Sequence, residues 1–393
     1  MHMMLPPLRL LGAEVLTPDG FASEAVDLLN GQIVTCSGGA VVDLSGYWLL
    51  PGIVDLHGDG FERQLFPRPS APFPIRDALA ATDREAASHG VTTAYLAQSW
   101  SWEGGMRGPD QAERLMQAVL DWREHALTDL RVQIRAETHL VDEVPRLISA
   151  VERFRIGYVV FNDHIEEGLS MQRLNPDGFA HWARKAGLSP RDLSDRIEAA
   201  WARTREMPRA LLAMAEAFDR LGVVYGSHDD RDAETRELYR IIGARIAEFP
   251  TTRSAAAAAK AGGDPVLMGA PNVVRGGSQA GNVSAVEILR DGLCDGLVSD
   301  YHIPALPLAV WRLVDEGVLS LAQAWHLVST GPAQVLRLSD RGEIAPGLRA
   351  DLVAVNKATR AVEMTIAGGR LAHLSGQVAA RLCGQALARM AAE

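Results

Sequence analysis

The chain has 393 residues and a formal net charge of −10, with 47% hydrophobic and 22% charged residues. This length favours one large α/β domain together with a smaller one, because one small core does not hold so many residues. The acidic balance argues against a nucleic-acid partner, since proteins that bind nucleic acids usually carry a basic excess. It does not exclude an anionic small substrate, because a few arginines can make a local site positive.

Cysteine usage and the lengths of apolar runs bear on the cellular compartment and on membrane association. The N-terminal stretch contains two prolines and no small-residue cleavage site, so it predicts no signal peptide. No apolar run reaches about 18 residues, and we therefore expect no membrane span or membrane partner. Three widely separated cysteines predict neither a disulfide framework nor a zinc ribbon, which suits a reducing compartment, here the cytoplasm; they are Cys36, Cys294 and Cys383.

Both ends of the chain carry strand patterns. Near the N-terminus, Asn30-Gly31 separates two apolar runs, which is a strong signal for a β-hairpin. Near the C-terminus, the stretches "ADLVAVN" and "AVEMTIAGGRLAHL" also predict short strands. We therefore expect a small β-sandwich domain built from residues 1–50 plus 335–393.

The region between these ends has a different rhythm. Apolar strand-like runs alternate with amphipathic helical stretches such as 75–90, 110–127 and 209–221. This alternation predicts an α/β fold, a (β/α)8 barrel of the TIM type over residues 51–334. The eight predicted strands, in chain order, lie within 52–57, 91–98, 131–139, 157–164, 222–230, 243–250, 265–271 and 295–300.

The connection after the fourth predicted strand is unusually long. Between His164 and Gly222 it has helical periodicity interrupted at Pro190 and Pro208, which predicts an insertion at about 165–208. An insertion that follows a barrel strand lies on the catalytic face. Two interpretations stay open: a lid over the active site, or a structural elaboration only.

Imidazoles and carboxylates gather at the ends of the predicted strands, which form the functional edge of such a barrel. A lone histidine is more often a hydrogen-bonded core or surface residue than a ligand. Five strands ending in these groups nevertheless indicate a site for zinc, manganese or iron. The residues at these five strand ends are His57 and Asp59, Glu137 and His139, Asp163 and His164, His228 with Asp229 and Asp230, and Asp300 with His302; Glu248 lies at the end of a further predicted strand.

The first pair has a spacing with a physical reason. Residues i and i+2 of a strand point the same way, so His57 and Asp59 can both face the barrel mouth and bind one metal ion. The glycine between them offers little steric obstruction. By itself this H-x-D motif is a weak signal.

Several stretches resemble the amidohydrolase superfamily of metal-dependent hydrolases: "LLPGIVDLHGD", Asp300 at the last strand, and "GEIAPGLRADLVAV". A more specific resemblance is to the phosphonate-metabolism hydrolases of the carbon–phosphorus lyase pathway. It is carried by "LLPGIVDLHGD" with "PRP", "GSHDD", "AEFPTT", "VLMGAPNVVRGGSQAGNVSA" and "SDYHIP". This resemblance implies hydrolysis of α-D-ribose 1-methylphosphonate 5-triphosphate, a phosphorylated sugar, to the 5-phosphate and diphosphate.

One departure from the superfamily pattern concerns the metal bridge. Most amidohydrolases carry H-x-H on the first strand, where this chain has His57-Gly58-Asp59, which the more specific family accommodates. Many two-metal members use a carboxylated lysine as a bridge. Glu137 is the natural substitute here, because one carboxylate can span two cations. None of the three lysines ends a predicted barrel strand; they are Lys185, Lys260 and Lys357.

We predict a site for one or two divalent metal ions, with zinc as the first expectation and manganese or iron as alternatives. Asp300 is also predicted to take the proton from a metal-activated water. Asp229, Asp230 and His302 are predicted to orient the ligands or, equally, to cap helices. The predicted ligands are His57, Asp59, Glu137, His164, His228 and Asp300.

A glycine-rich stretch is predicted to bind the triphosphate. Glycines let backbone N–H groups approach an anion closely, and a guanidinium adds a bidentate contact. The range 284–287 fits a capping box, so a helix is expected to begin there with its positive end toward the site. The predicted phosphate contacts are Arg68, which two prolines would hold in place, and Arg275, Gly276, Gly277 and Ser278.

Two alternatives to this function stay open. The same metal site could hydrolyse an amide or a cyclic amide, or deaminate an amino-heterocycle. The chain could also be a non-catalytic barrel scaffold, although such relatives usually lose metal ligands. A homo-oligomer is compatible with the sequence.

Overall fold

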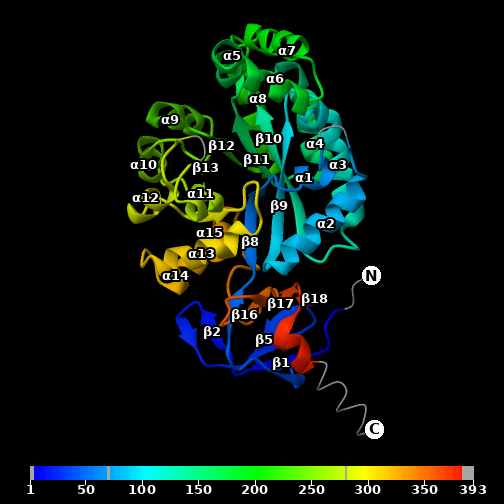
Figure 1. Cartoon of the computed structure of the whole chain (residues 1–393), viewed down its shortest axis with the longest axis vertical. Coiled ribbons are helices and arrows are strands. Elements are labelled where there is room, and N and C mark those ends of the chain that lie inside the picture. Colours follow the sequence, from blue (N-terminus) through cyan, green and yellow to red (C-terminus); the bar gives the residue numbers. More distant parts are fainter. Residues whose placement is uncertain (1–3, 69–70, 279–280, 383–393) are drawn as a thin grey trace.

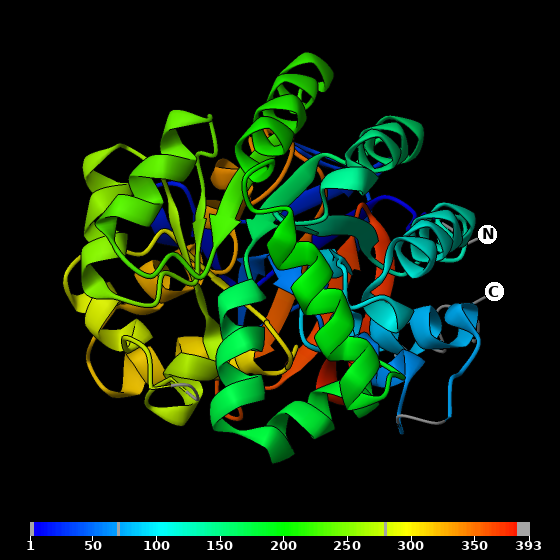
Figure 2. The same cartoon turned by 90° about the horizontal axis from the view of Figure 1, so that it is seen from above.

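The computed structural model describes residues 4–68, 71–278 and 281–382 (Figures 1 and 2). Eight parallel strands follow one another around a barrel in chain order, as the sequence predicted. Every predicted barrel run overlaps one of them. The strands are β8 (Ile53–Gly58), β9 (Val91–Trp100), β10 (Asp129–Glu137), β11 (Tyr158–Asn162), β12 (Val224–His228), β13 (Ala247–Glu248), β14 (Val266–Gly269) and β15 (Gly296–Val298).

The barrel is nearly closed between its first and last strands. A parallel bridge joins Gly58 to Asp300. The Asp300 N–H donates to the carbonyl of His57 at 2.9 Å, and the Asp59 N–H donates to the carbonyl of Asp300 at 2.8 Å. Closure therefore places Asp300 beside the His-Gly-Asp segment, although some 240 residues separate them along the chain.

Helices surround the barrel and connect its strands along the chain. Several begin or end with local signals: α8 ends at Gly222 with φ of 68°, and Thr252 caps the alanine-rich α10. The helices are α1 (Glu62–Leu65), α2 (Ile75–Ser88), α3 (Pro109–Trp122), α4 (Val144–Phe154), α8 (Met207–Leu221), α9 (Ala233–Ile241), α10 (Arg253–Ala261), α11 (Ala270–Arg275), α12 (Ala285–Arg290), α13 (Ala305–Asp315), α14 (Leu321–His326) and α15 (Thr330–Val335), with short 3-10 turns η1 (Gly105–Arg107) and η2 (Val141–Glu143).

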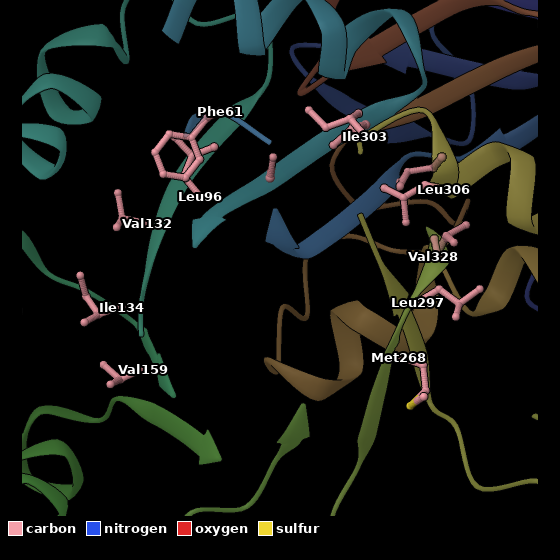
Figure 3. Close-up of a cluster of buried hydrophobic side chains, with 14 of the residues drawn as sticks. Phe61, Leu96, Val132, Ile134, Val159, Met268, Leu297, Ile303, Leu306 and Val328 are labelled. Atoms are coloured by element: carbon pink, nitrogen blue, oxygen red, sulfur yellow. The ribbon is translucent and has the colours of Figure 1, made fainter. Parts of the chain in front are cut away.

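The largest apolar cluster lies between the barrel strands and these helices (Figure 3). Val132 and Ile134 of β10 belong to it, as does Val159 of β11. Burying one such side chain contributes roughly 1.5–3 kcal/mol. Because side chains alternate along a strand, the intervening residues of β10, Gln133 and Arg135, point into the barrel interior.

The predicted insertion is a bundle of three helices, α5 (Ile165–Leu174), α6 (Pro176–Lys185) and α7 (Pro190–Ala202). Asn175 caps α6, and Ser189 forms a capping box with Asp192 at the start of α7. A separate apolar cluster, which includes Trp102 of the barrel, holds the bundle to the barrel. Figure 2 looks onto this end of the molecule, with the bundle in front of the barrel.

The chain termini form two further sheets at the opposite end (Figure 1). The order is β5-β4-β1-β6 in one and β18-β17-β16-β7-β2-β3 in the other, and one apolar cluster draws on both. The strands are β1 (Leu8–Leu11), β2 (Glu14–Thr17), β3 (Gly20–Ala22), β4 (Val26–Leu29), β5 (Gln32–Val34), β6 (Ala40–Asp43), β7 (Tyr47–Pro51), β16 (Leu352–Asn356), β17 (Val362–Ala367) and β18 (Arg370–Leu374).

The predicted hairpin is present in the first of these sheets. Asn30 and Gly31 join β4 to β5 with φ of 50° and 82°, the positive values that a type I′ turn requires. β7 pairs with β16, so the two ends of the chain share one sheet. On this basis we propose the division into residues 1–50 plus 335–393 and residues 51–334, with α15 crossing the second boundary.

Candidate metal centre

Three buried side chains at the carboxyl edge of the barrel form a cluster that can hold a metal ion. His57, His228 and Glu248 each offer a ligand atom within 4.8 Å of the others. They end β8, β12 and β13, and the two imidazole centroids lie 5.2 Å apart. Phe249 packs edge-on against both rings, at 5.0 Å and 4.9 Å, and so restricts their orientation.

The hydrogen bonds of the two histidines define their tautomers. His57 Nδ1 lies 2.8 Å from Glu248 Oε2, and His228 Nδ1 lies 2.8 Å from Asp229 Oδ2. A carboxylate accepts from an N–H, so in each neutral ring the proton is on Nδ1 and the lone pair on Nε2. The Nε2 of His228 is buried without any hydrogen-bond partner among the described residues. This free nitrogen, beside a second histidine oriented in the same way, fits a bound divalent metal ion.

Glu248 is fully buried, and each of its two carboxylate oxygens has a hydrogen-bond partner. Its Oε2 faces His57, while its Oε1 accepts from Gln133 at 2.7 Å and from Tyr158. Burial raises the pKa of Glu248, but His57 and His228 outweigh burial and hold that pKa below its usual value. Burial likewise lowers the pKa of His57, and the nearby Glu248 carboxylate reverses this and raises it.

A pocket of about 290 Å³ opens onto this cluster. Asp59 and Asp300 line it with the two histidines, so four of the six predicted ligands face one space. Burial, reinforced by the negative charge of Asp59, raises the pKa of Asp300 to about 6. A carboxyl group of this kind exchanges protons near neutral pH, as proton transfer during hydrolysis requires.

Arg135 brings a guanidinium into the same pocket. It is 8% exposed, and its Nη1 lies 3.5 Å from Asp59 Oδ2. In the amide orientation that pairs donors with acceptors, the side-chain oxygen of Asn162 accepts hydrogen bonds from Arg135 Nε at 3.2 Å and Nη2 at 3.1 Å. A cation fixed in this way can neutralise an anionic group that enters the pocket.

The other two predicted ligands, Glu137 and His164, contact each other. His164 Nδ1 is hydrogen-bonded to Glu137 Oε1, and its backbone N–H donates to Oε2 at 3.3 Å. Burial lowers the pKa of His164, but Glu137 overrides this and raises it to about 9. Neither residue joins the 4.8 Å cluster found among the described residues, and His164 lines a neighbouring, larger cavity.

The glycine-rich stretch forms one wall of the metal-site pocket. Arg275 ends α11, and Gly277 and Ser278 follow it along the wall. Gly276 has φ of 80° and ends the helix as a left-handed cap, outside the pocket lining. The chain thus runs along the pocket immediately after α11, and its binding of a phosphate stays a prediction.

The helix expected after this loop is present, but the predicted capping box is not. α12 begins after Ser284, whose side chain makes no capping hydrogen bond. Asn272 of α11 takes over this function, because its Oδ1 accepts from the Ala285 N–H at 3.0 Å. The local sequence pattern therefore predicted the start of the helix correctly. The hydrogen bond to the first backbone N–H of α12, however, comes from a residue of the neighbouring helix α11.

The remaining predicted residues are more scattered, and their roles stay predictions. Asp229 lines the pocket and holds His228. Asp230 is buried against Arg236 at 3.2 Å. His302 lies outside the pocket lining, as does the exposed Arg68; Pro69, which was expected to hold Arg68, falls outside the described residues.

Sequence reasoning missed two residues of β10. Gln133, Arg135 and Glu137 alternate with the apolar residues of that strand, so all three face the barrel interior. The period of two is visible in the sequence, but Gln133 and Arg135 lie within the strand, so the pattern of histidines and acids at strand ends does not include them. Glu248 does end a predicted strand, but the sequence assigns it no role.

Fold and site together define a hydrolase barrel of the amidohydrolase type, with a centre suited to a divalent metal ion. Among solved structures, the β-aspartyl dipeptidase of Fervidobacterium islandicum AW-1 matches with a TM-score of 0.64 and 15% identity, over 95% of this chain and 98% of that one. An amidohydrolase structure matches with a TM-score of 0.64 and 14% identity, over 94% and 99%. These likenesses concern the fold.

A curated relative is more specific. The chain is 33% identical over 330 residues to the α-D-ribose 1-methylphosphonate 5-triphosphate diphosphatase of Escherichia coli (strain K12), which covers 80% of this chain and 85% of the relative. No family model matches the chain. The chain therefore belongs to the family of that diphosphatase. No helix among the described residues has the length and apolar character needed to cross a membrane.

Proposed function

We propose that this chain hydrolyses α-D-ribose 1-methylphosphonate 5-triphosphate to the 5-phosphate and diphosphate, in phosphonate catabolism. The observation that carries the proposal is the shared pocket. Two oriented histidines, three carboxylates, Arg135 and the loop that begins at Arg275 all face it. The activity of the Escherichia coli relative supports the choice of substrate.

His57 and His228 would hold the metal ion through their Nε2 atoms, with a carboxylate of the pocket completing the set. When bound, a divalent ion supplies Lewis acidity, which lowers the pKa of water from about 15.7 toward 7 and attracts phosphoryl oxygens. Glu248 and Asp229 keep the imidazoles in the tautomer that presents Nε2. Zinc is the proposed ion, with manganese or iron as alternatives.

The side chains around the pocket would perform the proton and charge chemistry. Water oxygen forms a bond to phosphorus as the bond to the diphosphate oxygen breaks. Asp300, with its pKa raised to about 6, would accept the proton that water releases. Arg135 and Arg275 would neutralise the charge that spreads over the phosphoryl oxygens, which is the main requirement of phosphoryl transfer.

The test is a comparison of substrates on one metal-analysed sample. The ribosyl triphosphate, ATP and a β-aspartyl dipeptide, which carries no phosphate, are incubated in parallel, and diphosphate and free amino acid are measured. We expect diphosphate from the ribosyl triphosphate with the highest kcat/KM. Turnover of the dipeptide without diphosphate release from either triphosphate would replace the proposal with amide hydrolysis.

The surroundings of the reaction are also proposals. We place the protein in the cytoplasm, on the basis of its few, scattered cysteines. Its partner would be the small phosphorylated substrate rather than a nucleic acid or a membrane. A homo-oligomer remains compatible with the chain.

A further inference from the structure

A second cavity of about 1140 Å³ lies beside the metal-site pocket. Its walls come from α1, the turn after β9, the start of α3, and the insertion helices α5–α7. Small-molecule sites occupy roughly 300–1,000 Å³. The metal-site pocket, at about 290 Å³, is thus at the lower end for a molecule that carries a triphosphate, a pentose and a phosphonate.

The two spaces are neighbours at the barrel mouth, because Arg63 of the larger cavity donates to the backbone carbonyl of Tyr301 of the metal-site pocket at 2.6 Å. His164 ends the segment after β11 and bonds Glu137 of β10, yet its ring lines the larger cavity. Glu62 lines that cavity too, and it pairs with Arg107 at 3.5 Å. The charges of Asp59 and Arg135, both in the metal-site pocket, act on Glu62 as well. The two spaces are therefore adjacent, as a ligand that reaches from one into the other requires.

One buried carboxylate fixes the shape of this cavity. Glu103 accepts from the Trp182 indole N–H at 2.6 Å and from Arg107 at 3.4 Å. Its backbone carbonyl accepts from Arg196 of α7 at 2.6 Å. The barrel and the insertion are thereby joined across the cavity, so the insertion forms a defined wall.

The wall has the chemistry of a sugar and anion site. Carboxylates, guanidinium groups and an indole face one space, and sugar hydroxyls both donate to and accept from such groups. Most of its arginines are already paired: Arg107 with Glu62, and Arg146 with Asp110 at 2.7 Å. Arg114 differs, because it makes no side-chain hydrogen bond or ion pair within 4 Å to any residue that the structure describes.

We infer that this cavity binds the ribosyl phosphonate end of the substrate, with the Arg114 guanidinium on the phosphonate oxygens. The inference rests on the proposed function and adds the site that distinguishes this substrate from other triphosphates. The triphosphate would occupy the metal-site pocket and the glycine-rich wall. The insertion is then a specificity element, because it supplies Trp182 and Arg196 to the cavity.

The test uses two alanine variants, one within α3 and one at its C-terminal end. Arg114→Ala removes the proposed phosphonate contact. Arg123→Ala is the matched control, since Arg123 is also exposed and follows the last residue of α3, where it lines a different pocket. Both variants and the unaltered protein are assayed for kcat/KM with the ribosyl triphosphate and with inorganic triphosphate, which lacks the ribosyl phosphonate end.

We expect Arg114→Ala to lose at least tenfold in kcat/KM for the ribosyl triphosphate, mainly through KM, and less than twofold for inorganic triphosphate. Arg123→Ala should match the unaltered protein on both. Equal losses on the two substrates, or no loss on the ribosyl triphosphate, would overturn the inference.

A binding measurement separates this inference from the proposed reaction. Calorimetry with ribose 1-methylphosphonate 5-phosphate needs no turnover. We expect Arg114→Ala to weaken its binding about tenfold relative to Arg123→Ala. If the unaltered protein releases no diphosphate but this difference persists, the proposed reaction fails and the cavity assignment stands. Equal binding by both variants refutes the assignment.

Discussion

Replacing Glu248 with glutamine tests how the metal centre is held. Glu248 is fully buried; its Oε2 faces His57 Nδ1 at 2.8 Å, and its Oε1 accepts from Gln133 and Tyr158. Glutamine has nearly the same size, so it leaves no cavity. It offers only one acceptor oxygen, however, so the donors on one of the two sides lose their acceptor.

The magnitude follows from these contacts. A buried donor without an acceptor costs about 1–3 kcal/mol, and the free energy of unfolding of the metal-free protein should fall by that amount. Loss of a carboxylate that orients a metal-binding histidine typically weakens metal binding by roughly 10–100-fold. We expect Glu248→Gln to show both effects, because His57 is the residue that it orients.

The measurement is a zinc titration against a chromogenic chelator, with thermal unfolding of the metal-free protein alongside. Glu363→Gln is the matched control. Glu363 is 7% exposed in the terminal β structure, and it accepts from Tyr47 at 2.7 Å and from Asn356 at 2.9 Å. The Glu363→Gln variant should lower the free energy of unfolding by a similar amount and leave the affinity for zinc unchanged. Zinc binding by Glu248→Gln within twofold of the unaltered protein would refute the reasoning.

Three further predictions address catalysis, phosphate binding and stability. Asp300→Asn should lower diphosphate release at least 100-fold in a stopped assay with the folded, metal-loaded protein, because the proposed proton acceptor is lost; near-normal activity would remove Asp300 from the reaction. Arg275→Ala should raise KM for the ribosyl triphosphate roughly 10–100-fold, as expected for a charge-assisted contact, and a control titration with a monophosphate should change far less. Burial raises the pKa of Asp129, but Arg131 and Arg341 outweigh burial and lower that pKa to about 2 from 3.8. Because the folded pKa is the lower one, this stabilisation is present above about pH 4 and lost as the pH falls through 2. Asp129→Asn should thus reduce the free energy of unfolding by about 2 kcal/mol at pH 7, and denaturant titrations should show the difference fading toward pH 2; a constant difference across this range would contradict the assignment.

Local patterns in the sequence determined the barrel, its insertion and the edge that carries the chemistry. Strands and amphipathic helices can each be recognised within about ten to fifteen residues, because hydrophobic side chains recur with periods of 2 and 3.6 residues respectively. His57 and His228 could be picked out because each ends an apolar run. The Asn30-Gly31 hairpin likewise depends on local residue preferences, because both residues readily adopt the positive φ angles of the turn, and its prediction is confirmed.

Only the tertiary structure decided which of the strand-end groups meet. Glu248 contacts His57 across 191 positions of sequence, and no local pattern specifies that pairing. Glu137, predicted as a bridge between metal ions, is hydrogen-bonded to His164 across 27 positions, and its bridging role stays a prediction. Arg135 lines the pocket together with residues of other strands, and only the closed barrel brings these strands around one space. The physical reason is that periodicity fixes the face to which a side chain points, whereas the closure and packing of the whole barrel fix its neighbours.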